Sequence, residues 1–131
     1  MSEIIVAVAT PSGEGAIGIV RLSGRGCIEL VDPFFGARSL VQSAVRKAWF
    51  GVLADEAGSP IDEVVVTTYR NPASYTGEDS VEISCHGSPY ILSRVVQLCL
   101  DNGARMAQPG EFSQRAFLNG KLDLAQAEAV A

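Results

Sequence analysis

The sequence is poor in the side chains that build metal and redox sites. It has one histidine, His86, and three cysteines, Cys27, Cys85 and Cys99, without a CxxC or HxxxH spacing. A structural zinc site takes about four such ligands at close spacing, so we predict that the chain holds no metal. The cysteines are odd in number and far apart, and two of them occupy core positions of predicted elements, which indicates reduced, structural thiols.

Clustered positive charge is missing as well. Lys and Arg total 10 against 15 Asp and Glu, which gives a formal net charge of -5. Non-specific binding of nucleic acid depends on clusters of cations, so the chain alone is not expected to bind nucleic acid in that way. The sequence contains neither a secretory signal nor an apolar run long enough to cross a bilayer, and we therefore expect a cytoplasmic protein without membrane contact.

What the chain does have is the material for one hydrophobic core, since 47% of its 131 residues are hydrophobic. Apolar runs that are rich in branched residues, or that alternate with polar ones, predict strands at residues 4–9, 16–22, 48–54, 63–69 and 79–86. The strands at 48–54 and 63–69 are expected to form a hairpin, because turn formers are frequent between them.

The last of these strands leads into the clearest helix of the sequence. Ser88 can cap this helix, Pro89 suits its first position and Gly103 can end it. Its apolar stripe is expected to pack onto the sheet and consists of Leu92, Val95, Val96, Cys99 and Leu100.

Weaker signals complete the expected fold. A short helix is expected at 23–31, a short strand at 104–107 and a helix at 111–119, whereas residues 34–46 are expected to be mostly loop. A further helix should start at Asp123 and is unfinished at the last residue, so we expect the chain to be the front piece of a longer one. Strands followed by helices predict an α+β domain with a mixed or antiparallel sheet.

The strand at 79–86 carries two kinds of side chain. Alternation places Val81, Ile83 and Cys85 on one face, and Ser80, Glu82, Ser84 and His86 on the other. The polar face is either a binding site or an ordinary solvated face, and His86 is more often a turn or N-cap residue than a ligand. In the strand at 16–22, Arg21 is either a strand-end partner in a salt bridge or a fork for a carboxylate or phosphate.

Three stretches, in one order and over nearly the whole chain, carry a family pattern: VATPSGEGAIGIVRLSG at 8–24, SYTGEDSVEISCHG at 74–87 and PGEFSQRAFLNGKLDLAQAEAV at 109–130. In these stretches the sequence resembles the MnmE (TrmE) family of tRNA modification GTPases. Residues 33–60 carry little of the pattern.

The resemblance implies a fold similar to the tetrahydrofolate-binding domain of the aminomethyltransferases. Residues 1–120 would form an N-terminal tetrahydrofolate-binding and dimerisation domain, and residues 121–131 would begin a helical domain that holds an inserted G domain in the family. GTP, Mg²⁺ and K⁺ are implied for the full-length protein through that G domain. Because no GxxxxGK[ST] motif occurs in the chain, we expect it to hydrolyse no GTP and to contain no catalytic residues.

The resemblance also implies a reaction and partners for the full-length protein. Together with the flavin enzyme MnmG, it would add a carboxymethylaminomethyl group to the wobble uridine of certain tRNAs, using a one-carbon unit from a folate. The protein would be a homodimer, and tRNA would be bound by the whole complex. This chain would bind the tetrahydrofolate derivative, 5-formyltetrahydrofolate or a methylene form.

The folate contacts of the family fall on Arg21, Glu82 and Lys121, all of the expected residue type. A carboxylate such as that of Glu82 can accept two parallel hydrogen bonds from the adjacent donors of a reduced pterin. Arg21 and Lys121 suit the carboxylates of the glutamate tail or the formyl and carbonyl oxygens. The alternative is that these charges only form ion pairs.

Two further hypotheses belong to other classes of protein. The chain is a dimerisation scaffold with an unused folate site, or it is a stand-alone aminomethyl-transferring enzyme. The second needs a nucleophile paired with a base, and the sequence offers none.

Overall fold

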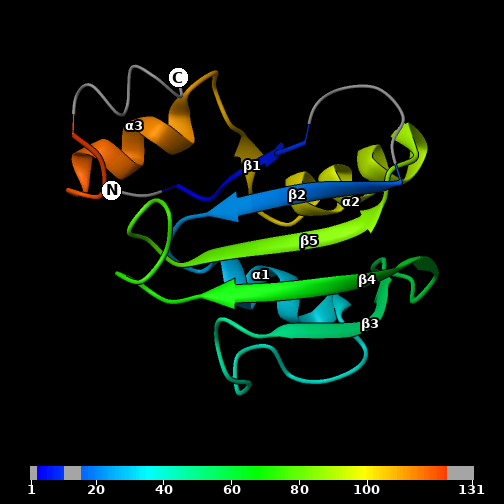
Figure 1. Ribbon diagram of the computed structural model, residues 1–131. Coiled ribbons are helices and arrows are strands. Elements are labelled where there is room, and N and C mark those ends of the chain that lie inside the picture. Colours follow the sequence, from blue (N-terminus) through cyan, green and yellow to red (C-terminus); the bar gives the residue numbers. More distant parts are fainter. Residues whose placement is uncertain (1–2, 11–15, 124–131) are drawn as a thin grey trace.

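A mixed sheet with the strand order β3-β4-β5-β2-β1-β6 forms the centre of the molecule (Figure 1). The computed structural model describes residues 3–10 and 16–123. Its strands are β1 Ile5–Val8, β2 Ile17–Ser23, β3 Ala48–Ala54, β4 Pro60–Tyr69, β5 Ser80–His86 and β6 Arg105–Met106. Its helices are α1 Cys27–Val31, α2 Pro89–Asp101 and α3 Glu111–Leu118, with a 3-10 turn, η1, at Asp32–Phe34.

All neighbouring strands run antiparallel except β1 and β6, which are parallel. The predicted α+β class with a mixed sheet is therefore confirmed. The expected hairpin is also present, as β3 and β4, although β4 starts at Pro60, earlier than its apolar run indicated. A proline is tolerated there because the first residue of a strand need not donate to the ladder.

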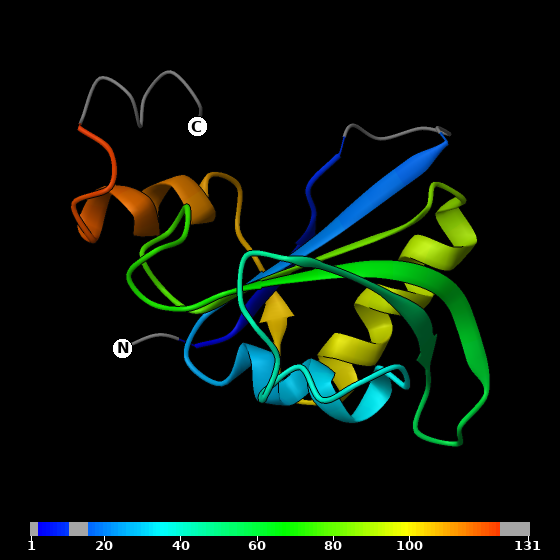
Figure 2. The same ribbon diagram turned by 60° about the horizontal axis from the view of Figure 1, so that its bottom comes forward.

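Helices α1 and α2 cover one face of the sheet (Figure 2). Between them and the strands lies one cluster of buried apolar side chains, with Val20, Val66 and Ile83 at its centre. The opposite face is covered by none of the described helices across β3, β4 and β5; we call this side of the sheet, including its part on β2, the open face. Its polar and charged side chains are thus left accessible, which is what a ligand site requires.

Helix α2 forms as its sequence predicted. Ser88 caps it by accepting a hydrogen bond from the backbone N–H of Ile91, and Pro89 is its first residue. The expected stripe faces the core, together with Leu98, which the stripe did not include. This helix therefore fixes which face of the sheet is buried.

The helix expected at 23–31 was predicted too long. It begins only at Cys27, because Ser23 is the last residue of β2, where its hydroxyl is buried and bonded to Thr76 instead of capping a helix. Gly24 and Gly26, with φ of 132° and 95°, make the turn between β2 and α1, a conformation that favours glycine. The helix expected from Asp123 onward lies outside the described residues.

Helix α3 stands apart from α1 and α2, beside the loop 70–79 that joins β4 to β5 (Figure 1). Among the residues that the structure describes, no helix is both long enough and apolar enough to cross a membrane. The loop and α3 together build a wall at one end of the open face.

The close packing of β2 against α2 at Gly18 can be tested by substitution. A methyl group on Gly18 would lie 2.6 Å from Cδ2 of Leu92, so Gly18→Ala should lower the free energy of unfolding by about 1–3 kcal/mol through overpacking. Urea unfolding of Gly18→Ala, Leu92→Ala and the double variant measures the effect. Because the second substitution makes room for the first, the double variant should lose less than the sum of the two; simple additivity would contradict this packing.

Candidate functional site

Strand pairing places two oppositely charged side chains side by side on the open face. Arg21 of β2 lies opposite Glu82 of β5; its Nε donates to the carboxylate oxygen Oε2 at 3.0 Å, and its Nη2 lies 2.9 Å from the same oxygen. The two side chains are 29% and 28% exposed. The pair is thus half-buried and reachable, and it occupies only part of the bonding capacity of each group.

Two aromatic rings flank the guanidinium of Arg21. The ring of Tyr75, from the loop 70–79, has its centroid 5.7 Å from the guanidinium carbon, and the ring of Phe112, from α3, lies at 5.8 Å. Cation–π attraction holds the arginine between the two elements. Tyr75 in turn contacts α3, because its hydroxyl lies 3.0 Å from Oγ of Ser113. The site consequently has flat apolar walls next to its charges.

A chain of ion pairs fixes α3 against the loop. Arg115 of α3 donates to Glu78 of the loop at 2.9 Å and lies 3.4 Å from Glu111. Glu111 also accepts from Arg105 of β6 at 2.6 Å and from the backbone N–H of Gln108 at 2.9 Å. The Arg105 hydrogen bond is the main reason that the pKa of Glu111 is lowered to about 2. Thus β6, α3 and the loop are joined through two carboxylates, Glu111 and Glu78, which both contact Arg115.

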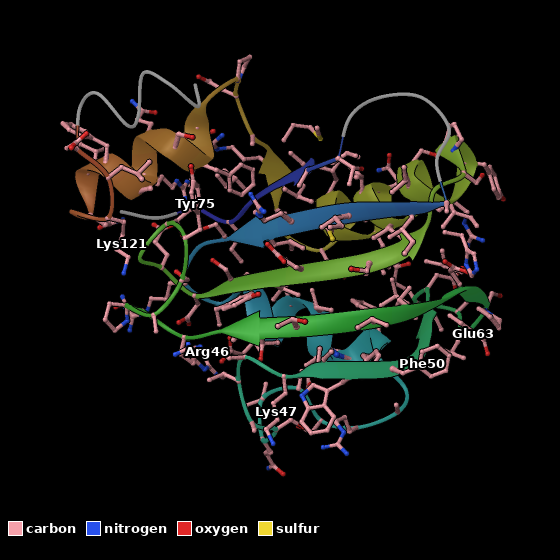
Figure 3. The ribbon with its side chains drawn as sticks, in the orientation of Figure 1. Arg46, Lys47, Phe50, Glu63, Tyr75 and Lys121 are labelled. Carbon is pink, nitrogen blue, oxygen red and sulfur yellow. The ribbon has the colours of Figure 1, made fainter. Side chains whose placement is uncertain are left out.

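Lys121 lies on the far side of the same loop. Its Nζ donates to the carbonyl of Pro72 at 3.2 Å, and its side chain lies against Gly77. Figure 3 shows it near Tyr75, at the end of the sheet where the Arg21–Glu82 pair lies. The structure therefore brings Arg21 and Glu82 into contact, whereas Lys121 touches neither of them and adds a positive charge beyond the loop.

The pair leaves groups free for a ligand. Within the described residues, no hydrogen bond reaches Oε1 of Glu82 or uses Nη1 of Arg21. One unused acceptor and one unused donor therefore lie on the same face, beside aromatic rings. Such an arrangement suits a flat heterocycle that presents both donors and acceptors.

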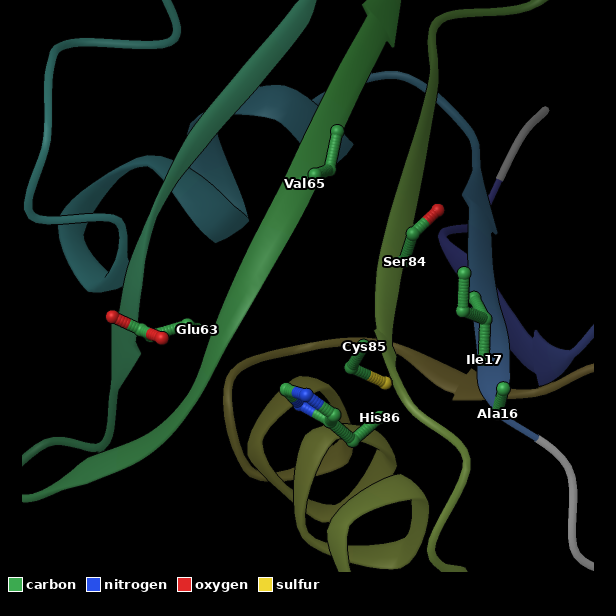
Figure 4. A pocket seen from close by; sticks show the side chains of 7 residues that line it. All are labelled: Ala16, Ile17, Glu63, Val65, Ser84, Cys85 and His86. Carbon is green, nitrogen blue, oxygen red and sulfur yellow. The ribbon is translucent and has the colours of Figure 1, made fainter.

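His86 occupies the other end of the open face, where Asp62 holds its ring. The Nδ1 atom lies 2.8 Å from Oδ1 of Asp62, and the backbone N–H of His86 donates to Oδ2 at 2.8 Å. His86 ends β5, as the alternation predicted, and the cap of the following helix is Ser88. Its ring borders a pocket of about 210 Å³ that Glu63 and Ser84 also line (Figure 4).

The three cysteines are free and buried. Burial raises the pKa of Cys85 to about 11 and that of Cys99 to about 12, so both thiols stay protonated and unreactive near neutral pH. Among residues 3–10 and 16–123, no three His, Cys, Asp or Glu side chains gather as metal ligands do.

Sequence reasoning missed the residues that surround the charged pair. Tyr75 and Phe112 are the aromatic residues of a turn and of a helix start, and their position in conspicuous motifs was an available signal. Nothing in the sequence pointed to Arg105 as the partner of Glu111, because that contact depends on the parallel pairing of β6 with β1.

Fold and site together define an α+β domain that presents an ion-paired, aromatic-walled polar site on an open sheet face. A family model described as "GTP-binding protein TrmE N-terminus" matches residues 4–121, and the chain belongs to this family. It is similar to proteins named "tRNA modification GTPase MnmE": 58% identical over 131 residues to that of Aquifex aeolicus (strain VF5), covering 100% of this chain and 29% of the relative.

Other relatives with the same name give the same picture. The protein of Salinibacter ruber is 54% identical over 130 residues, covering 99% of this chain and 28% of the relative. That of Thermotoga maritima is 53% identical over 128 residues, covering 98% and 28%. The chain thus spans less than a third of the length of these relatives.

Because of the Glu111 ion pairs, we predict that the stability of the fold decreases at acidic pH. A carboxylate whose folded pKa, about 2, lies below its ordinary value of 4.5 stabilises the fold above that ordinary value, and this stabilisation is lost as the pH falls from 4.5 towards 2. Glu111→Gln should therefore unfold more easily at pH 7, by about 1–3 kcal/mol, and should lose less stability than wild type on acidification. Urea unfolding at pH 7 and pH 3.5 measures both. Equal losses in the two proteins between these pH values would contradict the assignment.

Proposed function

We propose that this chain is the N-terminal, tetrahydrofolate-binding domain of a tRNA modification GTPase. The Arg21–Glu82 pair is the observation that carries the proposal, because these residues hold the family's expected folate contacts and meet on the open face. The name of the relatives, tRNA modification GTPase, supports the tRNA-modifying part. A partly exposed ion pair whose guanidinium is flanked by two aromatic rings favours this proposal over a bare scaffold.

The ligand chemistry follows from the free atoms of the site. Glu82 accepts the adjacent amino and ring N–H donors of a reduced pterin, with Oε1 and the remaining lone pair of Oε2. Tyr75 and Phe112 offer apolar faces for the flat ring system. The free N–H of Arg21 donates to a carbonyl or formyl oxygen. Lys121, beyond the loop, supplies positive charge for the anionic end of a 5-formyltetrahydrofolate.

In the full-length protein the folate would supply the one-carbon unit for the wobble uridine. The protein would work in the cytoplasm with MnmG, a flavin enzyme, and would contact tRNA through the complex of the two. GTP, Mg²⁺ and K⁺ belong to a G domain, for which this chain has no phosphate-loop motif. The chain contributes the folate pocket and a contact between two copies of the protein.

Replacing Glu82 tests the pterin contact. Glu82→Gln keeps the size but turns one acceptor towards the ligand into a donor, so binding of 5-formyltetrahydrofolate should weaken by roughly 2–4 kcal/mol, or about 30- to 900-fold. Stability should change by less than about 1 kcal/mol, because the Arg21 pair is half-exposed. Isothermal titration and urea unfolding measure the two effects.

Glu63→Gln is the matched control, since Glu63 lies on the same face but borders the distant pocket at His86. It should bind folate as wild type does. If Glu82→Gln also bound normally while Arg21→Ala abolished binding, the pterin assignment would be wrong and the tail would hold the ligand.

The open face also supports self-association. Large apolar side chains are exposed on it, chiefly Ile17 of β2 at 64% and Phe50 of β3 at 65%, and Figure 3 shows Phe50 at the edge of the sheet. An apolar face of this kind is normally covered, and a second copy related by two-fold symmetry is the commonest cover for a homo-oligomer. We infer a homodimer that uses this face.

Phe50→Glu should shift the protein towards the monomer without unfolding it, because the ring is exposed and the new carboxylate would be buried in the dimer. Sedimentation velocity over a concentration series measures the shift. Tyr90→Glu is the control, since Tyr90 is equally exposed but lies on α2, on the covered side of the sheet. A wild-type monomer at the highest concentration, or equal effects of both variants, would contradict the interface.

A further inference from the structure

Arg46 lies at the border of the candidate folate site, although it is far from Glu82 in the sequence. Its backbone N–H donates to the carbonyl of Thr68 at 2.7 Å, which ties it to the end of β4. Figure 3 shows Arg46 beside this end of β4, at the same end of the sheet as Tyr75 and Lys121. The segment before β3 is thereby fixed next to the site.

The strand register gives the spacing. Ala48 of β3 pairs with Thr67 of β4, and Thr67 pairs with Glu82 of β5, so these residues form one row across the open face. Two steps between strands amount to about 10 Å. Arg46 precedes Ala48 by two residues, which places its backbone roughly 10–12 Å from the backbone of Glu82, within the reach of a long side chain and a ligand.

The charge of Arg46 reaches the site. The pKa of Tyr69 is raised, first by burial and then by the negative charge of Glu82, and the positive charges of Arg21 and Arg46 oppose the increase. Tyr69 is the last residue of β4 and shares the open face with Glu82. The Tyr69 side chain therefore lies within the electrostatic range of the charged pair and of Arg46.

Arg46 is also unusual in its backbone and its partners. It is the non-glycine residue with positive φ, at 61°, among those described, and this conformation costs an L-residue about 1–2 kcal/mol. Several arginines form salt bridges: Arg21, Arg70, Arg94, Arg105 and Arg115. No carboxylate of residues 3–10 and 16–123 forms such a bridge with Arg46, so its guanidinium keeps its bonding capacity.

We propose that Arg46 binds a carboxylate of the folate's glutamate tail and so makes the site selective for folates over simple pterins. The inference rests on the proposed function. With the pterin at Glu82, the anionic groups of the ligand lie at its other end, and the p-aminobenzoyl spacer is long enough to cross the row to Arg46. A guanidinium binds a carboxylate through two parallel hydrogen bonds. Arg21 is paired with Glu82 and Lys121 is a single point charge beyond the loop, whereas the guanidinium of Arg46 has no carboxylate partner among the described residues and can offer two parallel N–H groups to the tail.

Arg46→Gly tests this role without disturbing the fold. Glycine adopts a φ of 61° freely, so the melting temperature of the variant should be unchanged or higher. Its affinity for 5-formyltetrahydrofolate should fall about tenfold, the effect of losing a charge-assisted contact. Its affinity for 5-formyl-6-methyltetrahydropterin, which lacks the tail, should equal that of wild type. Titration calorimetry with the two ligands gives the comparison.

Lys47→Ala is the matched control, because Lys47 is the neighbouring exposed cation but lies beside β3, away from the end of β4 (Figure 3). It should bind both ligands as wild type does. Equal losses for the tailed and tailless ligands, or no loss with Arg46→Gly, would overturn the inference while leaving the folate site intact. Absence of binding of either ligand to the wild-type protein would instead overturn the proposed function, and this inference with it.

Discussion

The antiparallel pairing of β2 with β5 is the constraint on which the rest of the structure depends. It sets Arg21 opposite Glu82 and, two residues further, Ser23 opposite Ser80. Side chains alternate between the two faces of a strand, so a slip of one residue would turn the charged pair into the core and expose Leu22 and Val81. Burying two charges and exposing two apolar residues would be costly, so the β2–β5 register is strongly favoured. This register brings Arg21 and Glu82 together.

The wall of the site, formed by α3 and the loop 70–79, is held in place by ion pairs outside the sheet. Arg115 and Glu78 join α3 to the loop, and their side chains are only 11% and 14% exposed. Each carboxylate in this network meets an arginine, and Ser23 of β2 donates a further hydrogen bond to Glu78 at 2.8 Å. A buried charge that loses its partner is costly, so loop, helix and strand keep one arrangement relative to one another. The aromatic rings beside Arg21 are positioned by this network.

Much of the fold was predictable because local rules decided it. Alternation in β5 gave its buried and open faces, and the cap at Ser88 with Pro89 gave the start of α2. The helix expected at 23–31 is shorter in the structure because the hydroxyl of Ser23 bonds to Thr76 and does not cap the helix. Local sequence patterns cannot predict such a tertiary contact. The partners of His86 and Glu111 come from β4 and β6, far along the chain, so only the folded sheet reveals them.

The charged pair is better suited to binding than to holding the fold together. A half-exposed ion pair contributes at most about 1 kcal/mol to stability, since water and salt screen it and two long side chains must be ordered. A ligand that takes over part of Glu82 therefore displaces little stabilising energy. Arg46 also contributes little to stability. Its positive φ destabilises the fold, and no salt bridge with a described residue offsets this cost. The pair and Arg46 thus lie at one end of the sheet as charged groups that contribute little to stability.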